Sequence, residues 1–161
     1  MKYISFIIFY QIIFVSNQMI AQNNIGDTSI YSKLRADIIE LNNKIEKDSK
    51  NVHLLNKRAI LKETINDYHG AIADYTKIIE LIPLSAYHYM ERGKLKYKLE
   101  DYPNAIKDFD KTLEIDNKYF SAYYYRGSSK IKLGDKDGAC LDWKQANQSK
   151  EAKDAINLNC N

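Results

Sequence analysis

The segment Ala86–Tyr119, AYHYMERGKLKYKLEDYPNAIKDFDKTLEIDNKY, decides the fold. Its pattern predicts two amphipathic helices joined by a short turn near Glu100-Asp101. The preceding segment Val52–Ser85 and the following segment Phe120–Lys153 have the same length of 34 residues and the same pattern. A single helical hairpin cannot bury its apolar face alone, so this period indicates three hairpins that stack on one another.

Three positions of the 34-residue unit carry the same class of side chain, small or aromatic, in every copy. Positions 8 and 20 are small, which lets two antiparallel helices approach closely, and position 24 is aromatic, which fills the groove beside them. In chain order these are Ala59, Gly93 and Gly127 at position 8, Ala71, Ala105 and Ala139 at position 20, and Tyr75, Phe109 and Trp143 at position 24.

Charged residues recur in the same register. Three of the four arginines of the chain stand at position 7, and an aspartate stands at position 23 of each copy. A planar, forked guanidinium suits a carboxylate better than an ammonium does. We therefore expect structural Arg–Asp ion pairs, within each hairpin or to the next one, rather than ligand-binding arginines. The residues are Arg58, Arg92 and Arg126 with Asp74, Asp108 and Asp142.

An aspartate also follows each predicted turn, at position 16. Asp67, Asp101 and Asp135 are expected to be N-caps, whose carboxylates accept free amides of the second helix. Pro103 suits the first turn of the second helix in the middle copy.

The segments outside the repeats have different patterns. Residues 1–21 resemble a secretory signal peptide, with Lys2 before an apolar run and cleavage expected after Ala21. An uncleaved anchor is the alternative, and it would be the only membrane association. Residues 22–28 are predicted to be a flexible leader, residues 29–50 an N-terminal capping helix and residues 151–161 a C-terminal capping helix.

The Ala21-Gln22 junction resembles those of secreted proteins in some Gram-negative bacteria. We therefore expect export to the periplasm or the exterior of such a cell. The net charge of +3 is too small to indicate a nucleic-acid partner.

The repeats resemble the tetratricopeptide repeat family over Val52–Lys153, about two thirds of the chain. The family pattern has a bulky residue at position 4, small residues at 8 and 20, an aromatic at 24 and often proline at 32. Here only Pro83 keeps the proline, and position 27 varies. The resemblance implies an all-α, right-handed superhelical solenoid of three hairpins with capping helices at both ends. It also implies a concave groove, lined by the first helices, that binds peptides or proteins without enzymatic activity.

The groove positions of the family give the candidate binding residues. They are Asn56, Ile60, Tyr87, Met90, Glu91, Lys94, Tyr97, Tyr124, Tyr125 and Ser128. Tyrosine and methionine offer large contact areas with polar or adaptable ends. The tyrosines are expected to anchor an extended segment or a helix of a partner, or else several of them pack between adjacent hairpins.

Some members of the family clamp a C-terminal carboxylate with basic and asparagine residues. Asn56 matches one such position, whereas Ile60, Glu91, Ser121 and Tyr125 do not match the others. The sequence therefore does not predict this clamp.

Cys140 and Cys160 are the only cysteines. Export would permit a disulfide between them, which would attach the C-terminal helix to the last hairpin and stabilise the fold by about 3 kcal/mol in the chain-entropy model. Two buried thiols or a redox pair are the alternatives.

The sequence shows no nucleophile, phosphate-binding or zinc motif, and it predicts no cofactor and no metal. Asp135-Lys136-Asp137-Gly138 lacks the distal ligands of a calcium loop. We expect a non-enzymatic, exported scaffold for a protein or peptide partner. The alternatives are a self-associating structural repeat protein and an accessory subunit of an envelope enzyme complex.

Overall fold

The computed structural model describes residues 29–146 and 148–160. The predicted signal peptide and the predicted leader lie outside them. The chain divides into two compact units, residues 1–42 and 43–161, and the boundary falls within a helix over residues 29–47. This helix lies inside the predicted range 29–50, and its role as a cap stays a prediction. Among the described residues, no helix is both long enough and apolar enough to cross a membrane.

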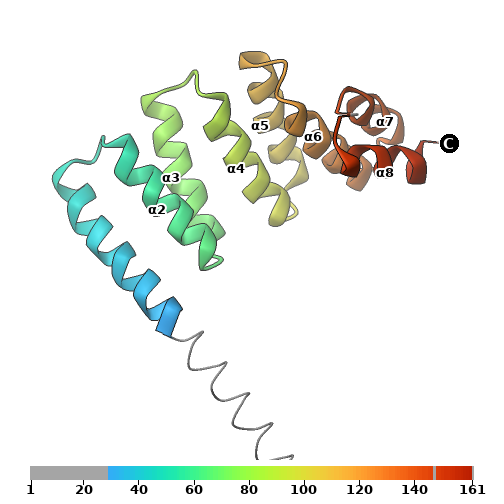
Figure 1. The fold of residues 1–161 in the computed structure, drawn as a ribbon. Coiled ribbons are helices and arrows are strands. Elements are labelled where there is room, and N and C mark those ends of the chain that lie inside the picture. The colour runs from blue at the N-terminus through green and yellow to red at the C-terminus, as the bar shows by residue number, and fades with distance from the viewer. Residues whose placement is uncertain (1–28, 147, 161) are drawn as a thin grey trace, which may run out of the picture. The chain divides into compact units, whose positions relative to one another are not determined.

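The second unit is a stack of helical hairpins (Figure 1). Its helices are α2 (Val52–Thr64), α3 (Tyr68–Leu81), α4 (Ala86–Lys98), α5 (Tyr102–Ile115), α6 (Phe120–Lys132), α7 (Lys136–Gln145) and α8 (Lys150–Asn159). Each helix packs against the next one along the chain. Hairpin one (α2–α3), hairpin two (α4–α5) and hairpin three (α6–α7) form a right-handed superhelical solenoid, and α8 packs on α7. The predicted fold class is confirmed.

The small residues lie where the two helices of a hairpin are closest. Ala71, Ala105 and Ala139 are completely buried. A Cβ atom built on Gly93 would lie 2.7 Å from the ring of Phe109, and one built on Gly127 would lie 2.9 Å from the indole of Trp143. The recurring small and aromatic positions therefore have matching surroundings in successive hairpins, as the repeat requires.

Each hairpin contains a buried aspartate with two cationic partners. In hairpin two, Arg92 donates to Asp108 through Nε at 2.9 Å and Nη2 at 2.6 Å, and the Nζ atom of Lys96 lies 2.7 Å from the same carboxylate. Asp108 is only 3% exposed. We call this arrangement of Arg, Lys and Asp the triad. The other two triads are Arg58, Lys62 and Asp74 in hairpin one, and Arg126, Lys130 and Asp142 in hairpin three.

Two of the arginines also reach the preceding hairpin. The Nη1 atom of Arg92 donates to the Thr76 hydroxyl at 3.0 Å, and that of Arg126 donates to Asp110 at 2.6 Å. Thr76 and Asp110 occupy the same repeat position. The arginine therefore joins the two helices of its own hairpin and also joins that hairpin to its neighbour.

The turns of the hairpins use a left-handed residue at position 15. The φ angles are +62° at Asn66, +61° at Glu100 and +86° at Gly134. Glycine and asparagine adopt this conformation readily, whereas a side chain such as that of glutamate is strained there. The turn of hairpin two therefore carries a residue that its backbone does not favour.

The predicted N-cap bonds form in two of the three hairpins. Asp67 accepts from the amide of Gly70, and Asp135 accepts from that of Gly138, each at 2.9 Å. The Asp101 carboxylate instead accepts from the Asn104 side chain at 3.0 Å, so its predicted backbone bond is wrong. A Cβ atom on Gly70 or Gly138 would lie 2.2 Å from the capping carboxylate. Asn104, at the same repeat position, has such a Cβ atom and keeps the carboxylate away from its amide.

Helix α7 ends earlier than its counterparts. It has 10 residues, whereas α3 and α5 have 14. Apolar residues at positions 28 and 30 of the first two copies are replaced by Asn147 and Ser149 in the third. Ser149 then caps α8 by accepting from the amide of Ala152 at 3.0 Å. The second helix of the third hairpin therefore ends at Gln145, and a new helix, α8, begins before Lys153, the last residue of the predicted repeat.

We expect Arg92→Lys to destabilise the protein by about 1–3 kcal/mol, because lysine keeps the charge but loses the forked contact with Asp108 and the bond to Thr76. Urea unfolding followed by circular dichroism measures this loss. Arg35→Lys, at an exposed position, is the matched control and should change the free energy of unfolding by less than about 0.5 kcal/mol. Equal effects of the two substitutions would contradict the structural role of the triad.

We expect Glu100→Gly to stabilise the protein by about 1 kcal/mol, because it relieves the left-handed strain. Gly134→Ala should have the opposite effect at the equivalent position. Glu114→Gly, at an exposed helical position, is the control for a general effect of glycine and should destabilise. Thermal unfolding of the three variants gives the comparison, and a lower melting temperature for Glu100→Gly would refute the expectation.

Candidate binding groove

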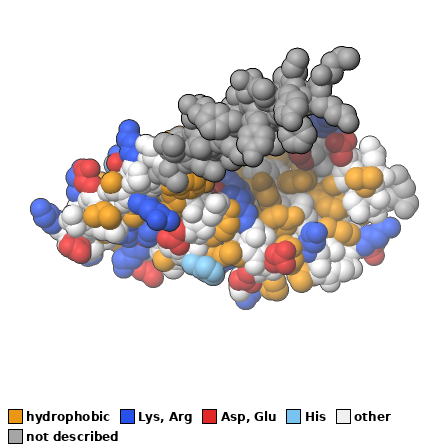
Figure 2. Space-filling model, turned by 90° about the horizontal axis from the view of Figure 1, so that it is seen from below, with side chains coloured by type: hydrophobic (Ala, Val, Ile, Leu, Met, Phe, Trp, Pro, Cys, Tyr) orange, Lys and Arg blue, Asp and Glu red, His pale blue; other side chains and the backbone are white. Residues whose placement is uncertain are grey.

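The first helices of the hairpins carry the predicted groove residues. Tyr87 is 42% exposed and Ile60 is 44% exposed. Tyr97, Tyr124 and Tyr125 are half-buried. The face shown in Figure 2 mixes hydrophobic side chains with charges of both signs. The uncovered part of that face is therefore not dominated by charge of one sign.

Three of the predicted tyrosines lie together. The ring of Tyr125 lies 5.7 Å from that of Tyr97 on α4 and 5.3 Å from that of Tyr124, both edge to face. It also stacks on Phe109 at 5.9 Å between ring centroids. We call Tyr97, Tyr124 and Tyr125 the tyrosine cluster. Its members pack partly between hairpins and remain partly exposed, so the role of the exposed parts as anchors for a partner stays a prediction.

Tyr87 lies apart from the cluster. Its ring makes an edge-to-face contact with His88, at 5.1 Å between centroids. Burial raises the pKa of Tyr87, and the nearby Glu91 carboxylate adds to the increase. Tyr87 is thus a neutral phenol at neutral pH, with an exposed ring and a hydroxyl available to a partner.

Charged residues between the rings are paired with each other. The Nζ atom of Lys94 lies 2.7 and 2.8 Å from the two oxygens of Glu91. Burial alone would lower the pKa of Lys94, but the hydrogen bond and the charge of Glu91 outweigh it, so the pKa is raised. Lys98 of hairpin two pairs with Glu63 of hairpin one at 2.7 Å. These pairs leave the middle of the groove close to neutral.

Two predicted groove residues are largely buried. Met90 is 2% exposed and packs in the core with Ala105, Phe109 and Ala122. The small side chain of Ala122 on α6 leaves room for methionine between hairpins two and three. Ser128 is 8% exposed and lies 3.4 Å from the indole nitrogen of Trp143. We correct the expected role of Met90 to packing, whereas Ser128 also lines an open space beside α8 and its groove role stays a prediction.

Asn56 is only partly accessible. Its carboxamide oxygen is buried and has no hydrogen-bond partner among the residues that the structure describes. No group of three or more His, Cys, Asp or Glu side chains arranged to hold a metal ion occurs in that part of the chain.

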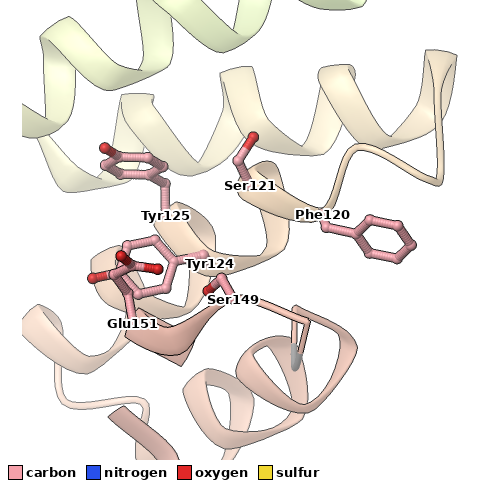
Figure 3. A pocket seen from close by; sticks show the side chains of 6 residues that line it. All are labelled: Phe120, Ser121, Tyr124, Tyr125, Ser149 and Glu151. Carbon is pink, nitrogen blue, oxygen red and sulfur yellow. The ribbon is translucent and has the colours of Figure 1, made fainter. Parts of the chain in front are cut away.

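Helix α8 completes a pocket at the end of the groove (Figure 3). This pocket has a volume of about 300 Å³, and we call it the α6–α8 pocket. It is lined by Phe120, Ser121, Tyr124, Tyr125, Ser149 and Glu151. A more open hollow of about 400 Å³ adjoins it along α8, where Tyr124, Trp143, Glu151, Asp154 and Leu158 are among the lining residues. The sequence did not reveal either space, because both depend on how α8 packs.

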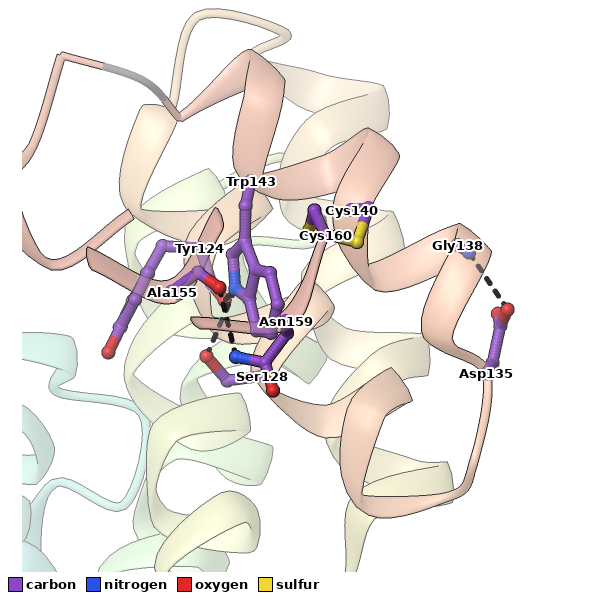
Figure 4. The surroundings of a disulfide bond; sticks show 9 residues. All are labelled: Tyr124, Ser128, Asp135, Gly138, Cys140, Trp143, Ala155, Asn159 and Cys160. Carbon is purple, nitrogen blue, oxygen red and sulfur yellow. Dashed lines mark hydrogen bonds between the residues drawn. A yellow bond between two sulfur atoms is a disulfide. The ribbon is translucent and has the colours of Figure 1, made fainter. Parts of the chain in front are cut away.

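A disulfide holds α8 in this place (Figure 4). Cys140 on α7 and Cys160 after α8 are bonded, with 5.7 Å between their Cα atoms. Ala152, Ala155 and Ile156 pack against a buried cluster that includes Trp143. The indole nitrogen of Trp143 donates to the carbonyl oxygen of Tyr124 at 3.2 Å, which ties α7 to the backbone of α6.

Known structures resemble this chain, although no family model and no curated protein matches it. A crystal structure of MamA has a TM-score of 0.69 at 22% identity, and the match covers 74% of this chain and 70% of MamA. The tetratricopeptide domain of Arabidopsis OM64 has a TM-score of 0.64 at 25% identity, with 66% and 92% covered. The first tetratricopeptide domain of Spaghetti (RPAP3), bound to the HSP90 peptide SRMEEVD, has a TM-score of 0.66 at 20% identity, with 70% and 93% covered.

These likenesses show the fold. Two of the three matched structures are named tetratricopeptide domains, and the matches extend over about two thirds or more of this chain. The chain therefore has the tetratricopeptide-repeat fold, as its sequence pattern predicts.

We expect His88 to make stability depend on pH. His88 is 8% exposed, with Nδ1 at 2.7 Å from the Ser85 hydroxyl, and burial lowers its pKa despite the opposing charge of Glu91. The unfolded chain therefore binds a proton more readily, and the free energy of unfolding should decrease as pH falls below about 6.5.

The test is urea unfolding at several pH values between 7.5 and 5. His88→Gln should lose less stability over this range than the parent protein. His69→Gln, at an exposed histidine, should follow the parent. Parallel pH profiles for all three proteins would contradict the assignment.

Proposed function

We propose that this protein is a non-enzymatic scaffold that holds a peptide or protein partner on the groove formed by its first helices. The observation that carries the proposal is the tyrosine cluster, which lies half-buried beside an open pocket at the end of that groove. Aromatic residues with one face exposed are typical of binding surfaces. The peptide-bound Spaghetti domain supports the proposal, because it has a similar fold.

The contacts favour an extended segment or a helix whose apolar side chains meet the rings of Tyr87 and Tyr124. The groove is close to neutral because Glu91 pairs with Lys94, so apolar contact supplies most of the affinity. A carboxylate clamp does not fit, since Glu91 occupies a position where the clamp needs a donor and Tyr125 packs on Phe109. The mixed surface charge gives nucleic acid no site.

We also propose that the protein works outside the cytoplasm, in the periplasm or the exterior of a Gram-negative cell. The Cys140–Cys160 bond supports this location, because disulfides persist in oxidising compartments. The signal-like sequence of residues 1–21 points the same way.

Self-association is the second candidate function. Leu141 and Leu158 are 65% and 83% exposed near the C-terminal end of the solenoid, where a second copy or a larger envelope complex would find apolar surface. Light scattering at increasing concentration separates this candidate from the first. A constant monomer mass would exclude it.

The first candidate predicts that Tyr87→Ala with Tyr124→Ala abolishes partner capture. The double variant removes the exposed Tyr87 ring on α4 and the half-buried Tyr124 ring on α6, so the apparent affinity should fall by at least about tenfold. Chemical crosslinking in an envelope extract, followed by mass spectrometry, identifies the partner. Titration calorimetry with that purified partner then measures the loss.

The control pair is Leu84→Ala with Leu133→Ala, which removes exposed apolar side chains outside the groove. Circular dichroism verifies that each variant is folded, and the single Tyr87→Ala variant replaces the double one if the latter unfolds. Unchanged binding by the folded groove variants would refute the proposed site.

A further inference from the structure

We propose that the α6–α8 pocket accepts a positively charged side chain, lysine or arginine, of the bound partner. The inference rests on the proposed function and adds to it the chemistry of one contact. It follows from three features of the pocket: its aromatic walls, a carboxylate without an ion-pair partner and a fixed shape.

Aromatic rings form much of the wall. Phe120, Tyr124 and Tyr125 line the space, and Figure 3 shows the two tyrosines near Glu151, with the ring of Phe120 pointing away from them. The two tyrosine rings meet edge to face at 77°, so their faces point in different directions. The face of an aromatic ring attracts cations, and it does so more strongly where water is partly excluded.

Glu151 supplies a full negative charge at the same place. Its side chain lines the pocket, is exposed and has no ion-pair partner among the described residues. The neighbouring Lys150 and Lys153 do not line the pocket. Lys94 of the groove is already paired with Glu91. A cationic guest would therefore meet an available carboxylate rather than compete for an existing pair.

Glu151 is not needed to cap its own helix. It lies in the first turn of α8, where a carboxylate is favourable. The capping bond of this helix comes instead from the hydroxyl of Ser149, which accepts from the amide of Ala152. The carboxylate thus remains free to contact a ligand.

Other guests fit less well. An anionic side chain would be repelled by Glu151. An apolar one would desolvate the carboxylate and the hydroxyls of Ser121 and Ser149 without giving them a hydrogen-bond donor. The ammonium of lysine or the guanidinium of arginine satisfies both the rings and the oxygens. The volume of about 300 Å³ is at the lower end of ligand pockets and suits one side chain rather than a whole ligand.

The pocket keeps its shape because both walls are fixed. Cys140–Cys160 attaches α8 to α7, and Trp143 attaches α7 to the carbonyl of Tyr124. A preformed site loses little entropy when it binds its ligand. Reduction of the disulfide should accordingly weaken cation binding.

The test uses small probes, so it needs no identified partner. The full chain, labelled with ¹⁵N, is titrated with N-acetyl-lysine methylamide, with the arginine analogue and with the neutral norleucine analogue. The two cationic probes should shift the amide signals near Tyr124 and Glu151 and bind about tenfold more tightly than the norleucine probe. Equal binding of norleucine and lysine probes would overturn the inference.

Two matched variants test which carboxylate of α8 attracts the cationic probes. Glu151→Gln should abolish the preference for the cationic probes while the spectrum of the folded protein is kept. Asp154→Asn removes the same charge one turn further along α8, beside the open hollow, and should retain the preference. If Asp154→Asn loses it and Glu151→Gln does not, the α6–α8 pocket is not the site.

The experiments distinguish a failure of the cation contact from a failure of the proposed scaffold function. A partner that binds normally to Glu151→Gln but not to the Tyr87 and Tyr124 variant would refute the cation contact and leave the scaffold intact. Loss of cationic-probe binding in Glu151→Gln supports the pocket even before a partner is known.

Discussion

The buried triad of arginine, lysine and aspartate is the interaction on which the solenoid depends. A carboxylate as buried as that of Asp108 is costly to remove from water unless donors surround it. Arg92 and Lys96 provide those donors from the partner helix, and their aliphatic stems cover the neighbouring apolar surface. Because the same arrangement recurs in each hairpin, the register between first and second helices is set in the same way three times.

The recurrence of residue types at a 34-residue spacing made much of this predictable. Arginine is rare in the chain, so its return at position 7 stood out and indicated the pairs with aspartate. Lysine is common, so its equally regular return at Lys62, Lys96 and Lys130 carried no visible signal, although the same register contained it. Met90 was misjudged for another reason. Its burial depends on Ala122 of the next hairpin, and a periodic pattern does not show how side chains from two hairpins fit together.

The α6–α8 pocket was even harder to predict from the sequence, because it depends on tertiary structure. Helix α8 has an ordinary amphipathic sequence, and its pattern gives no indication that Glu151 lies beside Tyr124 and Tyr125. The early end of α7 and the bond between Cys140 and Cys160 bring the two helices to this position. The site thus combines Tyr124 and Tyr125 of α6, which the 34-residue period places on the groove, with Glu151 of α8, at a repeat position where the other two copies have a turn.

The bonds that the arginines make between successive hairpins differ in kind. The link from Arg92 to Thr76 joins a charge to a neutral hydroxyl, whereas the link from Arg126 to Asp110 joins two opposite charges. The ion pair of Lys98 with Glu63 also joins hairpins one and two, so opposite charges connect the hairpins at both joints. Asp110 is 55% exposed and Lys98 is 43% exposed, and salt screens ion pairs that solvent reaches, so these links between hairpins should weaken as the ionic strength rises.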